Sequence, residues 1–171
     1  MRGPEFGTKK EKEQLVGYSH NFERYIDVDG QLVDRLEQSL RFGFLSPKEA
    51  QRLGIPHKKN LNIIYLGLRD PDNVIFLFPL KKINALPRWS NAVSVVFDRS
   101  LEVLSWEEMN EYQGGWPNLS PMLGEVYVLR RIDPQYLRQI LLPRSSKEEK
   151  EQVVGLVRHY VPKIADKIIV N

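Results

Sequence analysis

Residues 124–142 read GEVYVLRRIDPQYLRQILL, and this stretch sets the expectation for the fold. Its two short apolar runs predict a strand over 125–130, a turn at Asp133-Pro134 and a second strand near 138–142. One carboxylate, Glu125, stands at the head of the first strand directly after a glycine. Glu125 is either a solvated residue at the start of a strand or a group directed at a substrate. The pattern alone favours the solvated residue.

Strand signals continue upstream, through the middle of the chain. Runs rich in β-branched, aromatic and aliphatic residues predict strands over 15–20, 61–68, 74–80 and 89–97. The last of these carries an almost continuous apolar run, which is typical of a strand buried on both faces.

Helix signals lie toward the two ends. Hydrophobic spacing predicts a helix from about 30 to 41, ended by Gly43. Capping boxes predict a short helix after Ser46, with Glu49 as its partner, and a longer one over 146–161. This order of elements predicts an α+β domain with a largely antiparallel sheet, flanked by an N-terminal helical region and a C-terminal helix.

Composition narrows the class of protein. Residues 1–8, MRGPEFGT, resemble a cloning scar, and we treat 9–171 as a single domain. The sequence has no cysteine, which excludes disulfides, thiolate metal sites and a cysteine nucleophile, and which fits a reducing, cytoplasmic compartment. No apolar run reaches the roughly 20 residues that span a bilayer. The net charge of +3 is compatible with an anionic ligand, although the basic residues are spread among the acids.

Several chemical motifs are absent from the sequence. Neither glycine-rich phosphate loop, GxGxxG or GxxxxGK[ST], occurs, and there is no GxSxG nucleophile motif. The three histidines, His20, His57 and His159, lack metal-ligand spacing, so we expect no metal site. Glu125 differs from the other acids because a Gly-, Asn-, Ser- and Pro-rich loop delivers it to a strand, and such loops often carry ligand-binding residues.

Six segments occur in an order that resembles the ADP-ribosyltransferase fold. They are LVGYSH (15–20), GFLS (43–46), EAQRLGI (49–55), SVVFD (94–98), GEVYV (124–128) and IDPQYLRQI (132–140). The likeness is to the bacterial toxin-like and effector-like branches, including the DNA-targeting ADP-ribosyltransferase toxins. It covers about residues 15–142, and the order of the segments carries it because no single motif is specific.

The resemblance implies a fold, a substrate and a set of site residues. It implies that NAD lies as a substrate in a split cleft between two β-sheets, and that ADP-ribose passes to a macromolecular acceptor, either protein or nucleic acid, without a metal. Glu125 matches the catalytic glutamate. His20 and Arg24 match residues that contact the nicotinamide ribose or a phosphate, and Tyr65 matches the aromatic residue that stacks on nicotinamide, with Tyr18 a weaker match.

The sequence departs from the family pattern at two places. YSHNFERY (18–25) replaces the usual YHGT run, which leaves the alignment of His20 open. The acidic motif lacks the QxE or ExE doublet, because Leu123 stands two residues before Glu125, so arginine is a less expected acceptor.

An alternative is a non-catalytic interaction module on the same α+β fold, which would bind protein or nucleic acid. Trp89, Trp106 and Trp116 could then form an aromatic contact surface beside Arg88, although core packing is expected of at least one of them. A weaker alternative is nucleic-acid binding through the basic pairs Lys58-Lys59, Lys81-Lys82 and Arg130-Arg131.

Overall fold

The structure is a computed structural model, and it describes residues 15–23, 31–55, 70–80, 92–112, 125–143 and 145–171. The strands in these ranges are β1 (Gly17–Glu23), β2 (Phe44–Leu45), β3 (Val74–Leu80), β4 (Ala92–Asp98), β5 (Val126–Leu129), β6 (Arg131–Ile132), β7 (Leu137–Leu141) and β8 (Ile169–Val170). The helices are α2 (Gln31–Phe42), α3 (Pro47–Arg52), α4 (Trp106–Tyr112) and α5 (Lys147–Tyr160), with 3-10 turns η2 (Pro71–Asn73), η5 (Pro134–Tyr136) and η6 (Ala165–Lys167).

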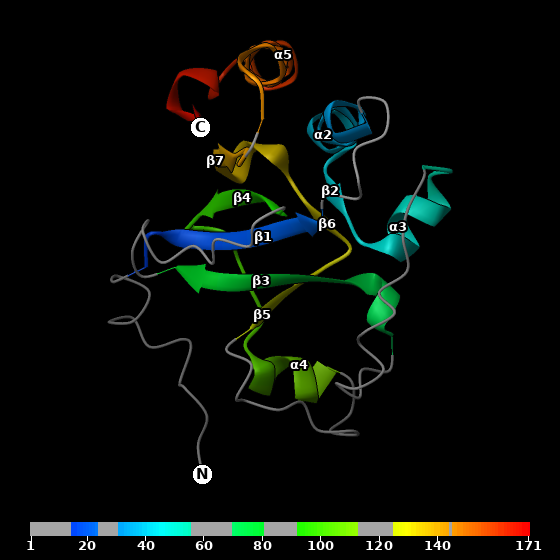
Figure 1. Cartoon of the computed structure of the whole chain (residues 1–171). Helices are drawn as coiled ribbons and strands as arrows, with labels where there is room; N and C mark the ends of the chain where they lie inside the picture. Colours follow the sequence, from blue (N-terminus) through cyan, green and yellow to red (C-terminus); the bar gives the residue numbers. More distant parts are fainter. Residues whose placement is uncertain (1–14, 24–30, 56–69, 81–91, 113–124, 144) are drawn as a thin grey trace.

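A six-stranded sheet with the order β5-β3-β1-β4-β7-β8 forms the centre of the described chain (Figure 1). Neighbouring strands are antiparallel except β7 and β8, which are parallel. A second, two-stranded sheet pairs β2 with β6. The predicted α+β class and the largely antiparallel sheet are therefore confirmed.

One face of the sheet carries the main core. Side chains alternate along a strand, so Val93, Val95 and Phe97 of β4 point to the same side, and all three are fully buried. Helices α2 and α5 cover this side, where they lie next to each other at the top of Figure 1. Their contributions to the core are Leu36 and Leu40 from α2 and Val153 and Val157 from α5, with Val161 added by the C-cap of α5. The four-residue spacing on each helix is that of a single apolar face.

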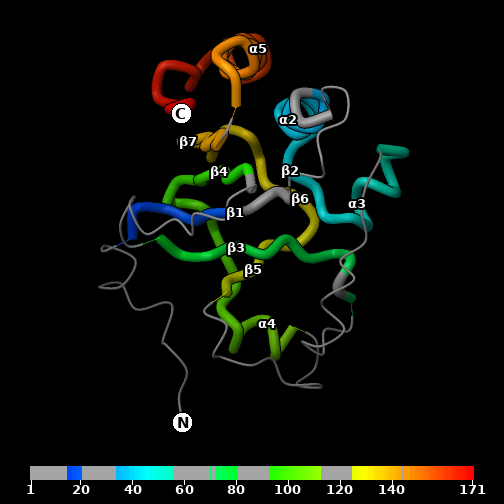
Figure 2. The backbone as a smooth tube through the Cα atoms, in the orientation of Figure 1, coloured from blue at the N-terminus to red at the C-terminus, as the bar shows by residue number. Residues whose placement is uncertain are grey.

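A smaller apolar cluster lies on the opposite face, near β5. Val74, Met109 and Tyr127 are buried together there. Tyr127 alternates along β5 with Val126 and Val128, which belong to the main core, so the two clusters lie on opposite faces. Helix α4 supplies Met109, and Figure 2 shows α4 at the far end of the molecule from α2 and α5.

Most predicted elements are present where the structure describes them. The strands expected over 74–80 and 89–97 correspond to β3 and β4, and the helices expected over 30–41 and 146–161 correspond to α2 and α5. Residues 125–142 form β5, the two-residue strand β6, a 3-10 turn after Asp133, and β7. The strand expected over 61–68 lies outside the described residues.

Both predicted helix caps form, and the arrangement at Ser46 differs from a complete capping box. The hydroxyl of Ser46 accepts a hydrogen bond from the Glu49 amide at 3.2 Å, as a cap requires. In a complete box the Glu49 carboxylate would accept from the Ser46 amide. That amide instead donates to the Arg130 carbonyl at 2.8 Å, and the Glu49 carboxylate binds Arg52.

The C-terminus of α2 is held by a glycine and an arginine. Gly43 has φ +100°, in the left-handed region that favours glycine. The Arg131 Nε donates to the Phe42 carbonyl at 2.9 Å, which satisfies a carbonyl at the helix end. The Arg131 side chain occupies the space where a Cβ at Gly43 would lie. The turn therefore needs glycine for two separate reasons.

Alanine substitutions at three glycines distinguish the effect of left-handed backbone from that of the contact with Arg131. We expect Gly43→Ala to lower the free energy of unfolding by about 2 kcal/mol or more, because it adds left-handed strain and displaces Arg131. Gly54→Ala should cost about 1 kcal/mol, since Gly54 has φ +69° but open space around it. Gly155→Ala, in α5 with no close neighbour, should stabilise by about 0.5–1 kcal/mol. Urea denaturation of the three variants measures the order, and equal effects at Gly43 and Gly54 would show that Arg131 does not constrain the turn.

Candidate functional site at the junction of β1, β3 and β5

Strand β3 exchanges its hydrogen-bonding partner midway along its length. Residues 74–77 pair with β5, and residues 78–80 pair with residues 17–19 of β1. From His20 onward, β1 pairs with β4 and no longer with β3 within the described chain. The two central strands thus share three residue pairs, and beyond these the sheet divides into a β3–β5 pair and a β1–β4–β7–β8 unit. We call this division the junction.

Glu125 lies at the junction, directly before β5. Val126 pairs with Leu77, and the register continued by one residue places Glu125 level with Phe78. The side chain is partly buried, and its Oε2 atom is buried without a hydrogen-bond partner among the described residues. Burial raises the pKa of Glu125 to about 6. At neutral pH the protein therefore holds an ionised carboxylate at a place that disfavours its charge.

Tyr127 is a second buried ionisable group on the same strand. Because side chains alternate, Tyr127 and Glu125 lie on the same face of the sheet. The ring packs edge-on against Phe76, with 5.6 Å between the ring centroids. Burial, and to a lesser extent the negative charge of Glu125, raise the pKa of Tyr127 well above its ordinary value. The carboxylate therefore lies close enough to the phenol to act on its charge, and Tyr127 stays neutral.

His20 lies on the other side of β3, at the first position where β1 and β3 no longer pair. Its Nδ1 is 2.8 Å from the Phe76 carbonyl oxygen, so the ring nitrogen donates to a backbone acceptor of β3. Burial lowers the pKa of His20, and the hydrogen bond to Phe76 opposes this in part. The imidazole is therefore neutral at neutral pH, with its Nδ1 bond fixing the ring orientation.

Glu125 and His20, two of the predicted site residues, come from strands on opposite sides of β3. Strands lie about 4.8 Å apart, so the backbones of β5 and β1 are separated by roughly 10 Å. His20 shares the helix-covered face with its partner Val95, whereas Glu125 shares the α4 face with Tyr127. The sheet therefore lies between the two side chains.

Two further residues at the junction were not predicted. Phe78 is 37% exposed although it lies within β3, and it pairs with Ser19 on one side and is level with Glu125 on the other. Ser19 is fully buried, and its hydroxyl is 3.4 Å from the Phe78 carbonyl. The apolar run VIFLFPL gave no signal to separate the exposed Phe78 from its buried neighbours. Only the change of strand partner places it at the junction.

The remaining predicted site residues divide into described and undescribed positions. Arg24 and Tyr65 lie outside the described residues, as do Trp89, Trp116 and the two lysine pairs. Tyr18, the weaker match to the stacking aromatic, is buried in the main core. Trp106 is partly buried and packs against the Met109 cluster, which agrees with core packing of at least one tryptophan.

The described residues contain neither a cluster of metal ligands nor a helix that could cross a membrane. No group of three or more His, Cys, Asp or Glu side chains in these ranges is arranged to hold a metal ion. None of the helices in these ranges combines the length and the apolar character needed to cross a membrane.

A scan of protein-family models, a search of curated proteins and a search of solved structures each found no match to the chain.

The raised pKa of Glu125 predicts a pH-dependent stability difference. A carboxyl whose pKa is higher in the folded state stabilises the fold below its unfolded pKa of about 4.3 and loses this contribution as the pH rises through about 6. We therefore expect Glu125→Gln to match the wild type near pH 4 and to be more stable above pH 7, by about 1 kcal/mol after allowance for solvent screening.

Urea unfolding of both proteins across this pH range measures the difference. Glu148→Gln, an exposed acid near the start of α5, is the matched control and should show no such pH dependence. A Glu125→Gln variant that is equally stable, or less stable, above pH 7 would show that burial does not penalise the Glu125 charge.

Proposed function

We propose that this chain is an NAD-dependent mono-ADP-ribosyltransferase-like domain in which Glu125 is the catalytic residue. The observation that carries the proposal is the buried Oε2 atom of Glu125, which has no hydrogen-bond partner in the part of the chain that the structure describes. A buried polar atom without a partner costs about 1–3 kcal/mol, and such atoms are rare in folded proteins. A substrate hydroxyl that donates to this oxygen would remove the cost, so the arrangement fits a binding role better than a purely structural one.

The chemistry of the proposed reaction suits a carboxylate in this state. The glycosidic C–N bond of NAD breaks, its electron pair leaves with nicotinamide, and the ribose becomes oxocarbenium-like. Glu125 accepts a hydrogen bond from a ribose hydroxyl and stabilises the positive charge as it develops. The acceptor nucleophile then bonds to the anomeric carbon and loses its proton, and a carboxylate with a pKa of about 6 is able to take a proton at neutral pH.

The position of Glu125 supports the proposal further. The residue stands directly before β5, the last strand of the sheet among the described residues, and the outer edge of β5 is bridged by Leu104 two residues further on, at Tyr127. Phe78, which is level with Glu125, offers an exposed aromatic ring beside the carboxylate. An aromatic face is a suitable platform for the planar nicotinamide. In this proposal His20 serves on the far side of the junction as a neutral, oriented imidazole.

The first test is release of nicotinamide from NAD, which needs no knowledge of the acceptor. We expect the wild type to release nicotinamide or to transfer labelled ADP-ribose in a cell extract. Glu125→Gln should lower this rate about a hundredfold or more, because the charge that stabilises the transition state is lost. Chromatographic detection of nicotinamide and labelling with a radioactive NAD measure the two outcomes.

The matched control for this test is again Glu148→Gln, which should keep the wild-type rate. Because we expect Glu125→Gln to be at least as stable as the wild type at neutral pH, its loss of activity would not reflect unfolding. An unchanged rate in Glu125→Gln would contradict the catalytic role. No turnover in the wild type, with no shift of its melting temperature by millimolar NAD, would favour the non-catalytic interaction module.

A second test concerns Phe78. Replacing its exposed ring with a flexible aliphatic group in Phe78→Leu should raise the NAD concentration at half-maximal rate by about tenfold, with a smaller effect on the maximal rate. Tyr112→Leu, which removes another exposed aromatic ring from the end of α4, is the matched control and should change neither quantity. Steady-state kinetics measures both, and a Phe78→Leu variant with wild-type kinetics would remove Phe78 from the proposed site.

A further inference from the structure

The turn between β5 and β6 holds a strained arginine. Arg130 has φ +69°, and among the described residues it is the only non-glycine residue with a positive φ. Left-handed backbone costs a non-glycine residue about 1–2 kcal/mol. Two backbone hydrogen bonds hold this conformation: the Arg130 amide donates to the Asn73 carbonyl at 3.0 Å, and its carbonyl accepts from the Ser46 amide at 2.8 Å.

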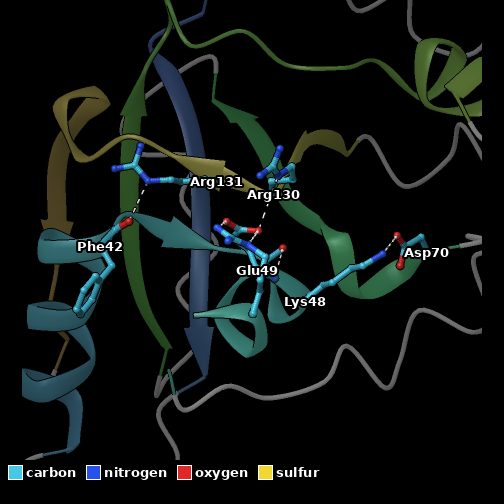
Figure 3. Close-up of polar contacts among 8 residues, drawn as sticks. Phe42, Lys48, Glu49, Asp70, Arg130 and Arg131 are labelled. Atoms are coloured by element: carbon cyan, nitrogen blue, oxygen red, sulfur yellow. Dashed lines mark hydrogen bonds and ion pairs between the residues drawn. The ribbon is translucent and has the colours of Figure 1, made fainter. Parts of the chain in front are cut away.

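The strained turn sends two consecutive arginines in different directions (Figure 3). Arg131 extends to the end of α2, where its Nε binds the Phe42 carbonyl. Arg130 extends toward α3 and its Glu49. The role of Arg131 is thus structural. The Arg130 guanidinium, by contrast, lies beside the Glu49 carboxylate.

The Glu49 carboxylate is already occupied by another arginine. Glu49 is only 8% exposed, and Arg52 binds both of its oxygens, with Nε–Oε2 at 3.1 Å and Nη2–Oε1 at 2.5 Å. Arg52 is also the main reason why the pKa of Glu49 is lowered. The Arg130 Nε lies 3.8 Å from Oε2, which is within ion-pair range but too long for a hydrogen bond.

The local balance of charge and hydrogen-bond donors is therefore incomplete. Two guanidinium groups face one carboxylate, which leaves one positive charge uncompensated within this group of three. The Arg130 guanidinium makes no hydrogen bond to another described residue, and its side chain is 65% exposed. An exposed ion pair of this length contributes about 0–1 kcal/mol, which does not offset the backbone strain. As a structural ion pair alone, Arg130 is poorly explained.

We propose that Arg130 and Arg52, which both approach the Glu49 carboxylate, form a binding site for a phosphate-type oxyanion. Guanidinium groups present several N–H donors in a fixed plane and bind phosphate oxygens in pairs. Glu49 holds Arg52 in place through two hydrogen bonds, and the β5–β6 turn holds the backbone of Arg130. Both side chains are more than half exposed, so an anion reaches them from solvent.

This site is separate from the junction. Arg130 follows the end of β5 that pairs with the start of β3, whereas Glu125 precedes the other end. The site is accordingly independent of the proposed NAD chemistry. The phosphate has two possible sources, a free phosphate compound or the phosphodiester backbone of a nucleic acid, and both present the same oxygens to the arginines.

Arg130→Gly is the variant that tests the site with least disturbance of the fold. Glycine adopts a positive φ without strain, so the turn should keep its shape and its stability. Arg52→Gln is a second variant: it removes one guanidinium and frees Glu49 to pair with Arg130. Arg158→Gln, which removes an exposed arginine from α5, is the control for a general loss of positive charge.

Calorimetric titration with inorganic pyrophosphate, and fluorescence anisotropy with a single-stranded oligothymidylate, distinguish the two sources. We expect the wild type to bind at least one probe, and Arg130→Gly and Arg52→Gln each to weaken that binding about tenfold or more, while Arg158→Gln has little effect. Pyrophosphate binding identifies a free phosphate compound, and binding of the oligonucleotide alone identifies a phosphodiester. Absence of binding to both probes, or equal weakening by Arg130→Gly and Arg158→Gln, would overturn the proposal.

Discussion

The change of partner by β3 is the constraint on which the rest of the structure depends. A strand that pairs along its whole length with the same neighbours forms a continuous sheet, with each backbone group bonded to the next strand. Here β1 and β3 share three residue pairs and then separate. His20 supplies a donor to the Phe76 carbonyl at the point where the ladder stops. Glu125 stands directly before the four-residue strand β5, level with Phe78 at the limit of the β1–β3 pairing, and its side chain is partly buried.

Much of the fold could be predicted because local signals are strong there. The four-residue spacing in α2 and α5, the serine caps at Ser46 and Ser146, and the apolar runs of β3 and β4 all depend on neighbours in sequence. The junction depends on pairing between residues far apart in the chain, such as Ser19 with Phe78. An apolar run has the same appearance whichever strands flank it. The exposure of Phe78 was therefore invisible in the sequence.

The candidate site also combines local features, which the sequence shows, with long-range features, which it does not. Glu125 could be chosen because it combines a loop, a glycine and a strand start, which are local features. Its buried, unpartnered oxygen and its raised pKa arise from packing against the rest of the sheet. His20 was chosen through a resemblance, and the structure places it at the junction but on the other face of the sheet. Successive side chains of a strand point to opposite faces of the sheet. The sequence of one strand does not show which of its residues share a face with a given residue of another strand.

Glu125 and Arg130 depart from local rules at opposite ends of the same four-residue strand. Within the described ranges no residue binds the buried oxygen of Glu125, and Arg130 adopts a backbone conformation that suits glycine. Chains are expected to satisfy local preferences except where function opposes them. The Ser46 cap shows a related departure. In a capping box the Ser46 amide would donate to the Glu49 carboxylate, but here it donates to the Arg130 carbonyl. The Glu49 carboxylate is therefore available to bind Arg52. Strand β5 thus joins two charged residues, Glu125 and Arg130, whose unfavourable local arrangements the fold alone does not explain. Binding of a ligand at each end of β5 would account for both.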